Sequence, residues 1–190
     1  MDSVQSVGKI MVGNLGMMAC IVFYLIWWYI AFNPNKDFPY AAKAALLVLT
    51  VIPGIFGLVQ LIKGIRLLSG SAGGVKPLTI VLAGVGVYVV MLLATYFLAH
   101  RQVTTELALI IGVSVLELCV ENALYSAGVV DRLDMLIYIF FLVVVSLVSL
   151  VCYLSYYNLG KMAAFYDGMV PLALFLILIL YQTGVLAKSS

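Results

Sequence analysis

Residues 135–157 read MLIYIFFLVVVSLVSLVCYLSYY, a run of 23 residues without one charged side chain. An α-helix rises 1.5 Å per residue, so roughly 20 apolar residues cross the hydrocarbon core of a bilayer, which is about 30 Å thick. The run therefore predicts a membrane-spanning helix. The same criterion is met by five further stretches, at residues 11–32, 44–62, 77–99, 107–130 and 162–187.

The composition of the whole chain agrees with these six spans. The 190 residues are 65% hydrophobic and 9% charged, with a mean hydropathy of +1.20. A soluble domain carries about 25% charged residues, so most of this surface needs lipid as its solvent. We expect an all-α, multi-pass membrane protein, a compact bundle of six transmembrane helices in the plasma membrane. No connecting segment is long enough for another domain, so residues 1–190 are expected to form a single transmembrane domain.

The lysines and arginines lie outside the six spans, and their distribution indicates the orientation of the chain in the membrane. With the N-terminus in the cytoplasm, six of them are inside (Lys9, Lys63, Arg66, Lys76, Arg132, Lys188) and four outside (Lys36, Lys43, Arg101, Lys161). This bias predicts an N-in, C-in topology. The net charge of +2 is too small to indicate a nucleic acid as a partner, and no run of basic residues follows a helix, so a polybasic lipid-binding patch is not expected.

The fourth span contains the residues that most need a functional explanation. Residues 106–122 read ELALIIGVSVLELCVEN. Glu117 and Glu121 are four residues apart and share a helix face, about 6 Å between their Cβ atoms. Glu106 precedes Glu117 by eleven residues, about three turns, and lies on nearly the same face at one mouth of the span. We interpret all three as candidate residues for ion binding or transport.

A charged carboxylate at the bilayer centre costs about 2.5–3.5 kcal/mol on insertion scales. The sequence offers no Lys, Arg or His inside another span as a partner. The glutamates are therefore expected to hold protons, to bind a cation or water in a polar cavity, or to meet a basic group on another subunit. In a purely structural alternative, protonated glutamates join neighbouring helices by hydrogen bonds. The candidate polar partners are Ser114, Asn122, Gln60, Thr50, Ser146 and Ser149, with Asn122 pointing away from the glutamates on an ideal helix.

Glycines and aromatic residues suggest how the bundle packs. Gly54, Gly57 and Gly64 in the second span, and Gly84 and Gly86 in the third, predict close helix contacts. Residues 27–29, Trp-Trp-Tyr, are typical of the aromatic belt near the headgroups.

The residue inventory argues against the common cofactors. His100 is the single histidine, so haem ligation by two histidines of one chain is excluded, and no Glu-x-x-His pair for a di-iron site occurs. No His, Cys and Asp residues have zinc-binding spacing. We expect no cofactor and no metal.

Three classes of function remain, in this order. The first is a small channel or carrier for a cation, a proton or a proton-coupled solute, with Glu117, Glu121 and Glu106 along its path and with several copies in a homo-oligomer. The second is a non-catalytic accessory or assembly subunit of a larger membrane complex, whose buried glutamates pair with a partner helix. The third is a membrane-embedded lipid-modifying enzyme, which ranks last because no nucleophile or metal cluster accompanies the carboxylates.

Overall fold

The structure is a computed structural model that describes residues 2–68, 75–97 and 105–189, and these residues form helices without any strand. The elements are α1 (Asp2–Phe32), α2 (Tyr40–Leu68), α3 (Pro77–Phe97), α4 (Thr105–Ser126), α5 (Arg132–Ser155), a short 3₁₀ helix η1 (Tyr156–Asn158), α6 (Lys161–Asp167) and α7 (Val170–Ser189). Within them lie six segments long and apolar enough to cross a membrane, with α6 and α7 together forming the sixth. The all-helical class and the six apolar helices expected from the sequence are thus confirmed.

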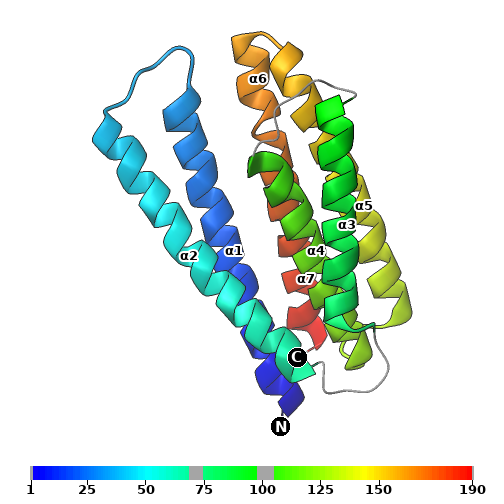
Figure 1. Cartoon of the computed structure of the whole chain (residues 1–190). Helices are drawn as coiled ribbons and strands as arrows, with labels where there is room; N and C mark the ends of the chain where they lie inside the picture. The colour runs from blue at the N-terminus through cyan, green and yellow to red at the C-terminus, as the bar shows by residue number, and fades with distance from the viewer. Residues whose placement is uncertain (1, 69–74, 98–104, 190) are drawn as a thin grey trace.

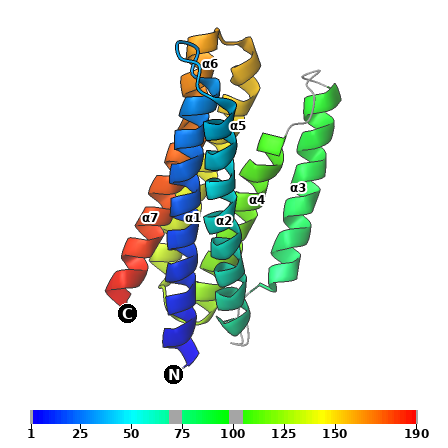
Figure 2. The same ribbon diagram turned by 90° about the vertical axis from the view of Figure 1, so that its left-hand side faces the viewer.

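The helices stand side by side as an up-and-down bundle (Figures 1 and 2). Helices α1 and α2 form an antiparallel hairpin, and α4 packs against α2, α3 and α5, while α7 packs against α1 and α5. Both chain termini lie at one end of the bundle, here called the N/C end, as an even number of helical segments running alternately up and down requires. The loop between α1 and α2 and helix α6 lie at the other end, here called the far end.

Helices α1 and α2 approach closely because glycines face each other. A Cβ atom added to Gly16 would lie 2.8 Å from the Cα of Gly57, and one added to Gly57 would lie 2.8 Å from the backbone oxygen of Gly13. On α3, a Cβ on Gly84 would collide with the side chain of Val115 on α4. Small residues at these positions allow backbone contact where lipid provides no hydrophobic drive for association. The predicted glycine contacts are confirmed at these positions, whereas Gly86 has open space around it.

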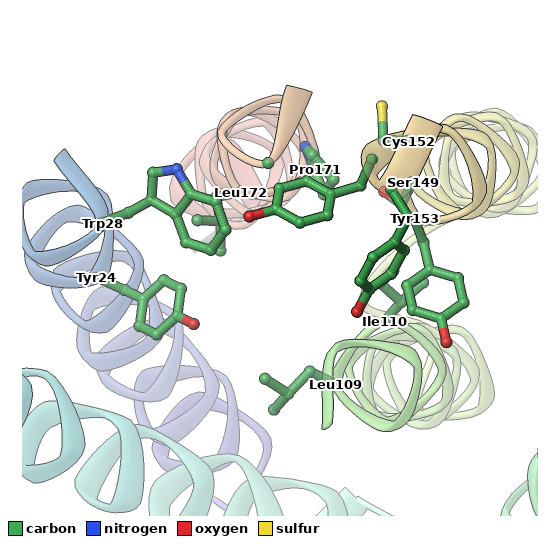
Figure 3. Close-up of a pocket in the computed structure, with 12 residues that line it drawn as sticks. Tyr24, Trp28, Leu109, Ile110, Ser149, Cys152, Tyr153, Pro171 and Leu172 are labelled. Carbon is green, nitrogen blue, oxygen red and sulfur yellow. The ribbon is translucent and has the colours of Figure 1, made fainter. Parts of the chain in front are cut away.

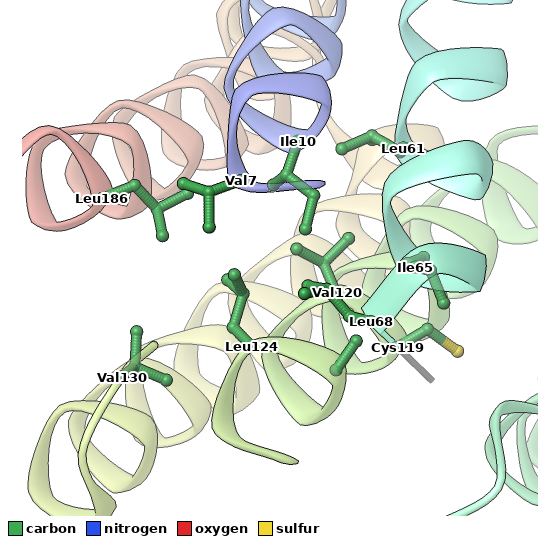
Figure 4. Packing of buried hydrophobic residues seen from close by; sticks show 11 residues of the cluster. Val7, Ile10, Leu61, Ile65, Leu68, Cys119, Val120, Leu124, Val130 and Leu186 are labelled. Atoms are coloured by element: carbon green, nitrogen blue, oxygen red, sulfur yellow. The ribbon is translucent and has the colours of Figure 1, made fainter. Parts of the chain in front are cut away.

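The first two helices are longer than the spans expected at residues 11–32 and 44–62. Helix α1 begins at Asp2, and Val7 and Ile10, which precede the expected span, are buried in one apolar cluster with Leu61 and Ile65 of α2 (Figure 4). The same apolar cluster includes residues of α4 and Leu186 of α7, so it joins four helices near the N/C end. Hydropathy marks the lipid-crossing stretch, whereas packing extends the helix beyond it.

Helix α4 ends earlier than the expected residue 130, at a glycine with a left-handed backbone. Gly128 has φ +70°, a conformation that costs other L-residues energy. The N–H of Val129 donates to the carbonyl of Leu124, and that of Gly128 to Tyr125, which is the Schellman arrangement. Asp131 then caps α5 by accepting a 2.7 Å hydrogen bond from the N–H of Asp134. This tight turn fixes α5 beside α4.

The sixth span, expected as one helix over residues 162–187, is divided at Gly168 and Met169. Pro171 has no N–H to donate to the preceding turn, so it is accommodated in the first turn of α7. The short helix α6 remains at the far end, where Asp167 Oδ2 accepts a 3.2 Å hydrogen bond from Ser155.

Apolar side chains cover the outside of the bundle. On α3, Leu78, Leu82 and Val90 are each more than 60% exposed. Apolar surface of this extent is normally removed from water. The six apolar helices and their covering therefore fit an integral, multi-pass membrane protein.

Candidate functional site

Glu117 lies in the interior of the bundle, although it is a carboxylate in an apolar helix. Its side chain is fully buried. The phenol of Tyr138 on α5 donates a 2.6 Å hydrogen bond to Glu117 Oε2. Tyr138 is itself buried in an apolar cluster formed by α1, α5 and α7, so its hydroxyl is held at the carboxylate. The first partner of the glutamate is thus neutral.

Glu121, one turn further along α4, is also buried and belongs to a chain of amide groups. Gln182 of α7 donates from Nε2 to Glu121 Oε2 at 3.1 Å. Asn14 of α1 donates from Nδ2 to Gln182 Oε1 at 2.9 Å and to Thr183 Oγ1 at 3.2 Å. Asn14 and Gln182 are buried as well. Four helices, α1, α4, α5 and α7, therefore contribute polar groups to two neighbouring sets of hydrogen bonds, one at each carboxylate, which are together called the carboxylate network.

This network has more acceptors than donors. Among the described residues, Glu117 Oε1 and Asn14 Oδ1 are buried and accept no hydrogen bond. Buried polar atoms are nearly always paired, so each such atom calls for a physical explanation. No Lys, Arg or His within residues 2–68, 75–97 and 105–189 contacts either glutamate. The site can therefore take up positive charge or protons without displacing a resident cation.

A small pocket lies beside Glu121, on the side of the N/C end of the bundle. It is lined by Glu121, Tyr138, Gln182 and Asp134, among others, and has a volume of about 10 Å³. A water molecule needs about this much space and a few polar partners. Asp134 lies in the first turn of α5, partly exposed. The pocket thus offers room for one water between a carboxylate near the helix end and the buried Glu121.

A larger pocket of about 90 Å³ lies toward the far end, between α1, α4, α5 and α7 (Figure 3). The side chains of Tyr24, Trp28, Leu109 and Leu172 surround its central space. Ile110 also lines it and precedes Glu117 on α4 by seven residues, about 10 Å along the helix. The two pockets therefore lie on opposite sides of the glutamates along the bundle axis.

Trp28 shapes the aromatic pocket and differs from the membrane-belt residue expected from the sequence. It is only 5% exposed, and its indole Nε1 donates a 3.0 Å hydrogen bond to the carbonyl of Phe165 on α6. A Cβ on Gly168 would lie 2.3 Å from the Trp28 ring, so the glycine leaves room for the indole. Its neighbour Tyr29 is exposed, as a belt residue would be.

The other residues singled out from the sequence have different surroundings. Ser114 and Ser146 join α4 and α5 through a 2.8 Å hydrogen bond between their hydroxyls. Ser149 and Thr50 bond to carbonyls of their own helices, and Gln60 is half-buried on α2. Asn122 pairs with the backbone of Val75, with its amide nitrogen donating at 2.7 Å and its oxygen accepting at 3.2 Å. Glu106 belongs to the first turn of α4, and its side chain lies outside the described residues, as do His100 and Arg101.

Sequence reasoning did not single out Tyr138, Gln182 or Asn14. Asn14 and Gln182 carry a usable signal, because amide side chains are rare within apolar spans and usually face the bundle interior. Tyr138 carries none, since it is one of twelve tyrosines and its partner lies on another helix.

Comparison of the chain with protein-family models, with curated protein sequences and with solved structures gives no match. The described residues contain no group of three or more His, Cys, Asp or Glu side chains that could hold a metal ion. Inferences about function therefore rest on the site itself.

Proposed function

We propose that the protein is a small membrane carrier in which Glu117 and Glu121 bind and release protons, coupled to movement of a small solute. One observation carries the proposal. Two carboxylates are buried at the centre of the bundle with neutral partners, and two acceptors of their network, Glu117 Oε1 and Asn14 Oδ1, have no donor.

Protons fit this network better than metal cations. A proton on a glutamate removes the cost of a charge in the membrane, about 2.5–3.5 kcal/mol on insertion scales. It also turns one carboxylate oxygen into a donor, which a network with excess acceptors requires. A hydrated cation needs more room than the 10 Å³ pocket beside Glu121 has. The tight packing also favours a carrier over an open channel.

Polar groups continue from the glutamates toward both ends of the bundle. Toward the N/C end, the small pocket joins Glu121 to Asp134. Toward the far end, Ser114 lies three residues before Glu117 and bonds to Ser146, and the aromatic pocket follows. We assign the aromatic pocket to the solute, because it is apolar with few polar groups, as small-molecule sites usually are, and its volume of about 90 Å³ restricts the solute to a molecule of few atoms.

The first experiment measures whether the glutamates exchange protons. Difference infrared spectra of the protein in proteoliposomes, recorded across a pH series, should contain a protonated-carboxyl band that changes with pH. The band should lose intensity in Glu117→Gln and in Glu121→Gln. A carboxyl band that stays constant over the whole series would instead match glutamates that only join helices, and would contradict the proposal.

The second experiment measures proton flux into the same proteoliposomes, driven by a membrane potential and followed with an enclosed pH dye. Glu117→Gln combined with Glu121→Gln should lower the flux at least tenfold with a normal gel-filtration profile. Asp37→Asn is the matched control. This carboxylate is exposed in the loop between α1 and α2, where the hydrogen bond and charge of Lys43 lower its pKa. Equal proton flux in the double variant and the wild type, with both above the flux into protein-free liposomes, would refute the assignment.

The accessory-subunit hypothesis requires the glutamates to contact a partner protein. A partner's basic group would have to reach Glu117 or Glu121, which are at most 2% exposed within this chain. Their burial therefore favours the carrier proposal. Gentle isolation of the tagged protein from its native membrane discriminates the two: homo-oligomers at multiples of 20.6 kDa fit a carrier, and a second polypeptide at fixed ratio fits a subunit.

A further inference from the structure

A groove unrelated to the glutamates lies between α2 and α3. These two helices stand apart, with α4 between them in both views (Figures 1 and 2). The groove has a volume of about 380 Å³, the size of a small-molecule site. Its walls are almost entirely apolar and include Ile62, Arg66, Pro77, Val81, Gly112 and Val115.

Contacts that hold α3 against α4 keep the groove open. Asn122 holds the backbone of Val75 with two hydrogen bonds, and Gly84 admits the side chain of Val115. Helix α3 is thereby fixed to α4 and not to α2, which packs on α1. The groove is a consequence of this arrangement, with α4 as its floor.

Positive charge gathers at one end of the groove. Arg66 lines it, Lys63 lies one turn earlier on α2, and Lys76 directly precedes Pro77, which also lines it. No carboxylate is among the described lining residues. The loop between α2 and α3 separates these cations in the sequence, which is why no basic run is visible there.

The length of the groove matches one leaflet of a bilayer. Its lining on α2 extends from Leu58 to Arg66, eight residues or about 12 Å. Half of the hydrocarbon core is about 15 Å thick. The cationic end is thus at headgroup depth when the apolar part is among the acyl chains. Basic pockets between transmembrane helices bind anionic lipid headgroups in this way.

We propose that this groove binds an anionic phospholipid, with one acyl chain between α2 and α3 and its phosphate at Arg66 and Lys76. The apolar walls supply the site for the chain, and the cations supply the preference for a negatively charged headgroup. The site is independent of the carboxylate network.

Native mass spectrometry of the purified protein tests the charge. Phosphatidylglycerol and phosphatidylcholine with identical acyl chains are added in competition. The wild type should bind one phosphatidylglycerol in preference, and Arg66→Gln should reduce that preference about fivefold, as expected for one interfacial charge. Lys36→Gln, which removes a cation at the far end, is the control and should leave the preference unchanged. Equal binding of both lipids by the wild type, or an unchanged preference in Arg66→Gln, overturns the proposal.

Gly112 permits a matched test of the apolar part. A Cβ on Gly112 has no atom within 4 Å, so Gly112→Ala leaves the groove open, while the longer side chain of Gly112→Leu would occupy the groove that Gly112 lines. Both replacements favour the helix over glycine. Gly112→Leu should lose the bound lipid, and Gly112→Ala should keep it. If Gly112→Leu still binds the lipid, the lipid does not occupy the groove and the proposal fails. If Gly112→Leu instead dissociates a homo-oligomer or a partner protein without any loss of lipid, the groove has another occupant and the proposal also fails.

Discussion

The phenolic oxygen of Tyr138 lies 2.6 Å from Glu117 Oε2, and both side chains are almost completely buried between α4 and α5. The contact joins a carboxylate to a neutral donor where an ion pair would be expected for a buried charge. It leaves the second oxygen of Glu117 without a donor among the described residues. This unbalanced set of groups supports the proposal that the site gains and loses a proton.

Tyr138→Phe should therefore change the state of Glu117 while keeping the aromatic packing. Removal of the hydroxyl leaves the carboxyl of Glu117 without its donor, which costs about 1–3 kcal/mol of folding free energy. The carbonyl band of protonated Glu117 should move to higher frequency in infrared spectra because its hydrogen bond is lost. Proton flux should fall as well.

Tyr166→Phe is the control for this change. Tyr166 is 60% exposed on α6, so its variant should match the wild type in stability, infrared spectrum and flux. If Tyr138→Phe also matched the wild type in all three measurements, the hydrogen bond to Glu117 would have no role in the site.

Asn14 and Gln182 should be energetically coupled, because Asn14 Nδ2 donates to Gln182 Oε1. A double-mutant cycle with Asn14→Ala and Gln182→Ala, followed by thermal unfolding in detergent, should give a coupling between about 0.6 and 1.7 kcal/mol, the average and the maximum for hydrogen bonds between membrane helices. Asn14→Ala combined with Ser146→Ala is the control cycle, since Ser146 bonds to Ser114 and to its own helix. Additive effects in the first cycle would contradict the network.

The spans were predictable because lipid imposes one strong requirement, a long apolar helix. Their ends were less so, since α1 continues to Asp2 through packing and α4 stops at Gly128 through a local turn. Hydropathy contains no information about either effect.

The two glutamates were visible as ionisable residues in an apolar run, but their partners were not. Tyr138 and Gln182 belong to other helices, and one sequence does not reveal which helix faces which. The same reason hid the basic end of the groove, because Arg66 of α2 and Pro77 of α3, which directly follows Lys76, line one groove only through the packing of the helices.

Gly168→Ala should disturb the aromatic pocket. The added methyl group would lie 2.3 Å from the Trp28 ring, which is fixed by its hydrogen bond to Phe165. Overpacking of this kind costs about 1–3 kcal/mol. A changed Trp fluorescence spectrum and a lower melting temperature are expected. Gly160→Ala is the control because a Cβ there meets no atom within 4 Å, and equal melting temperatures for both variants would contradict the described packing.

Gly57→Ala should separate α1 from α2. The new methyl group would lie 2.8 Å from the backbone oxygen of Gly13 and from the backbone nitrogen of Met17, and backbone atoms cannot move aside as a flexible side chain can. The helices must then shift apart, which weakens the packing of Ile10 against α2 at Gly64. We expect a loss of about 1–3 kcal/mol in the free energy of unfolding.

Gly86→Ala is the control for Gly57→Ala. Its Cβ has open space, and alanine favours a helix by up to about 1 kcal/mol over glycine, so this variant should unfold at the wild-type temperature or slightly above. Thermal unfolding of both variants in the same detergent tests the pair, and a Gly57→Ala variant as stable as Gly86→Ala would rule out the close contact between α1 and α2.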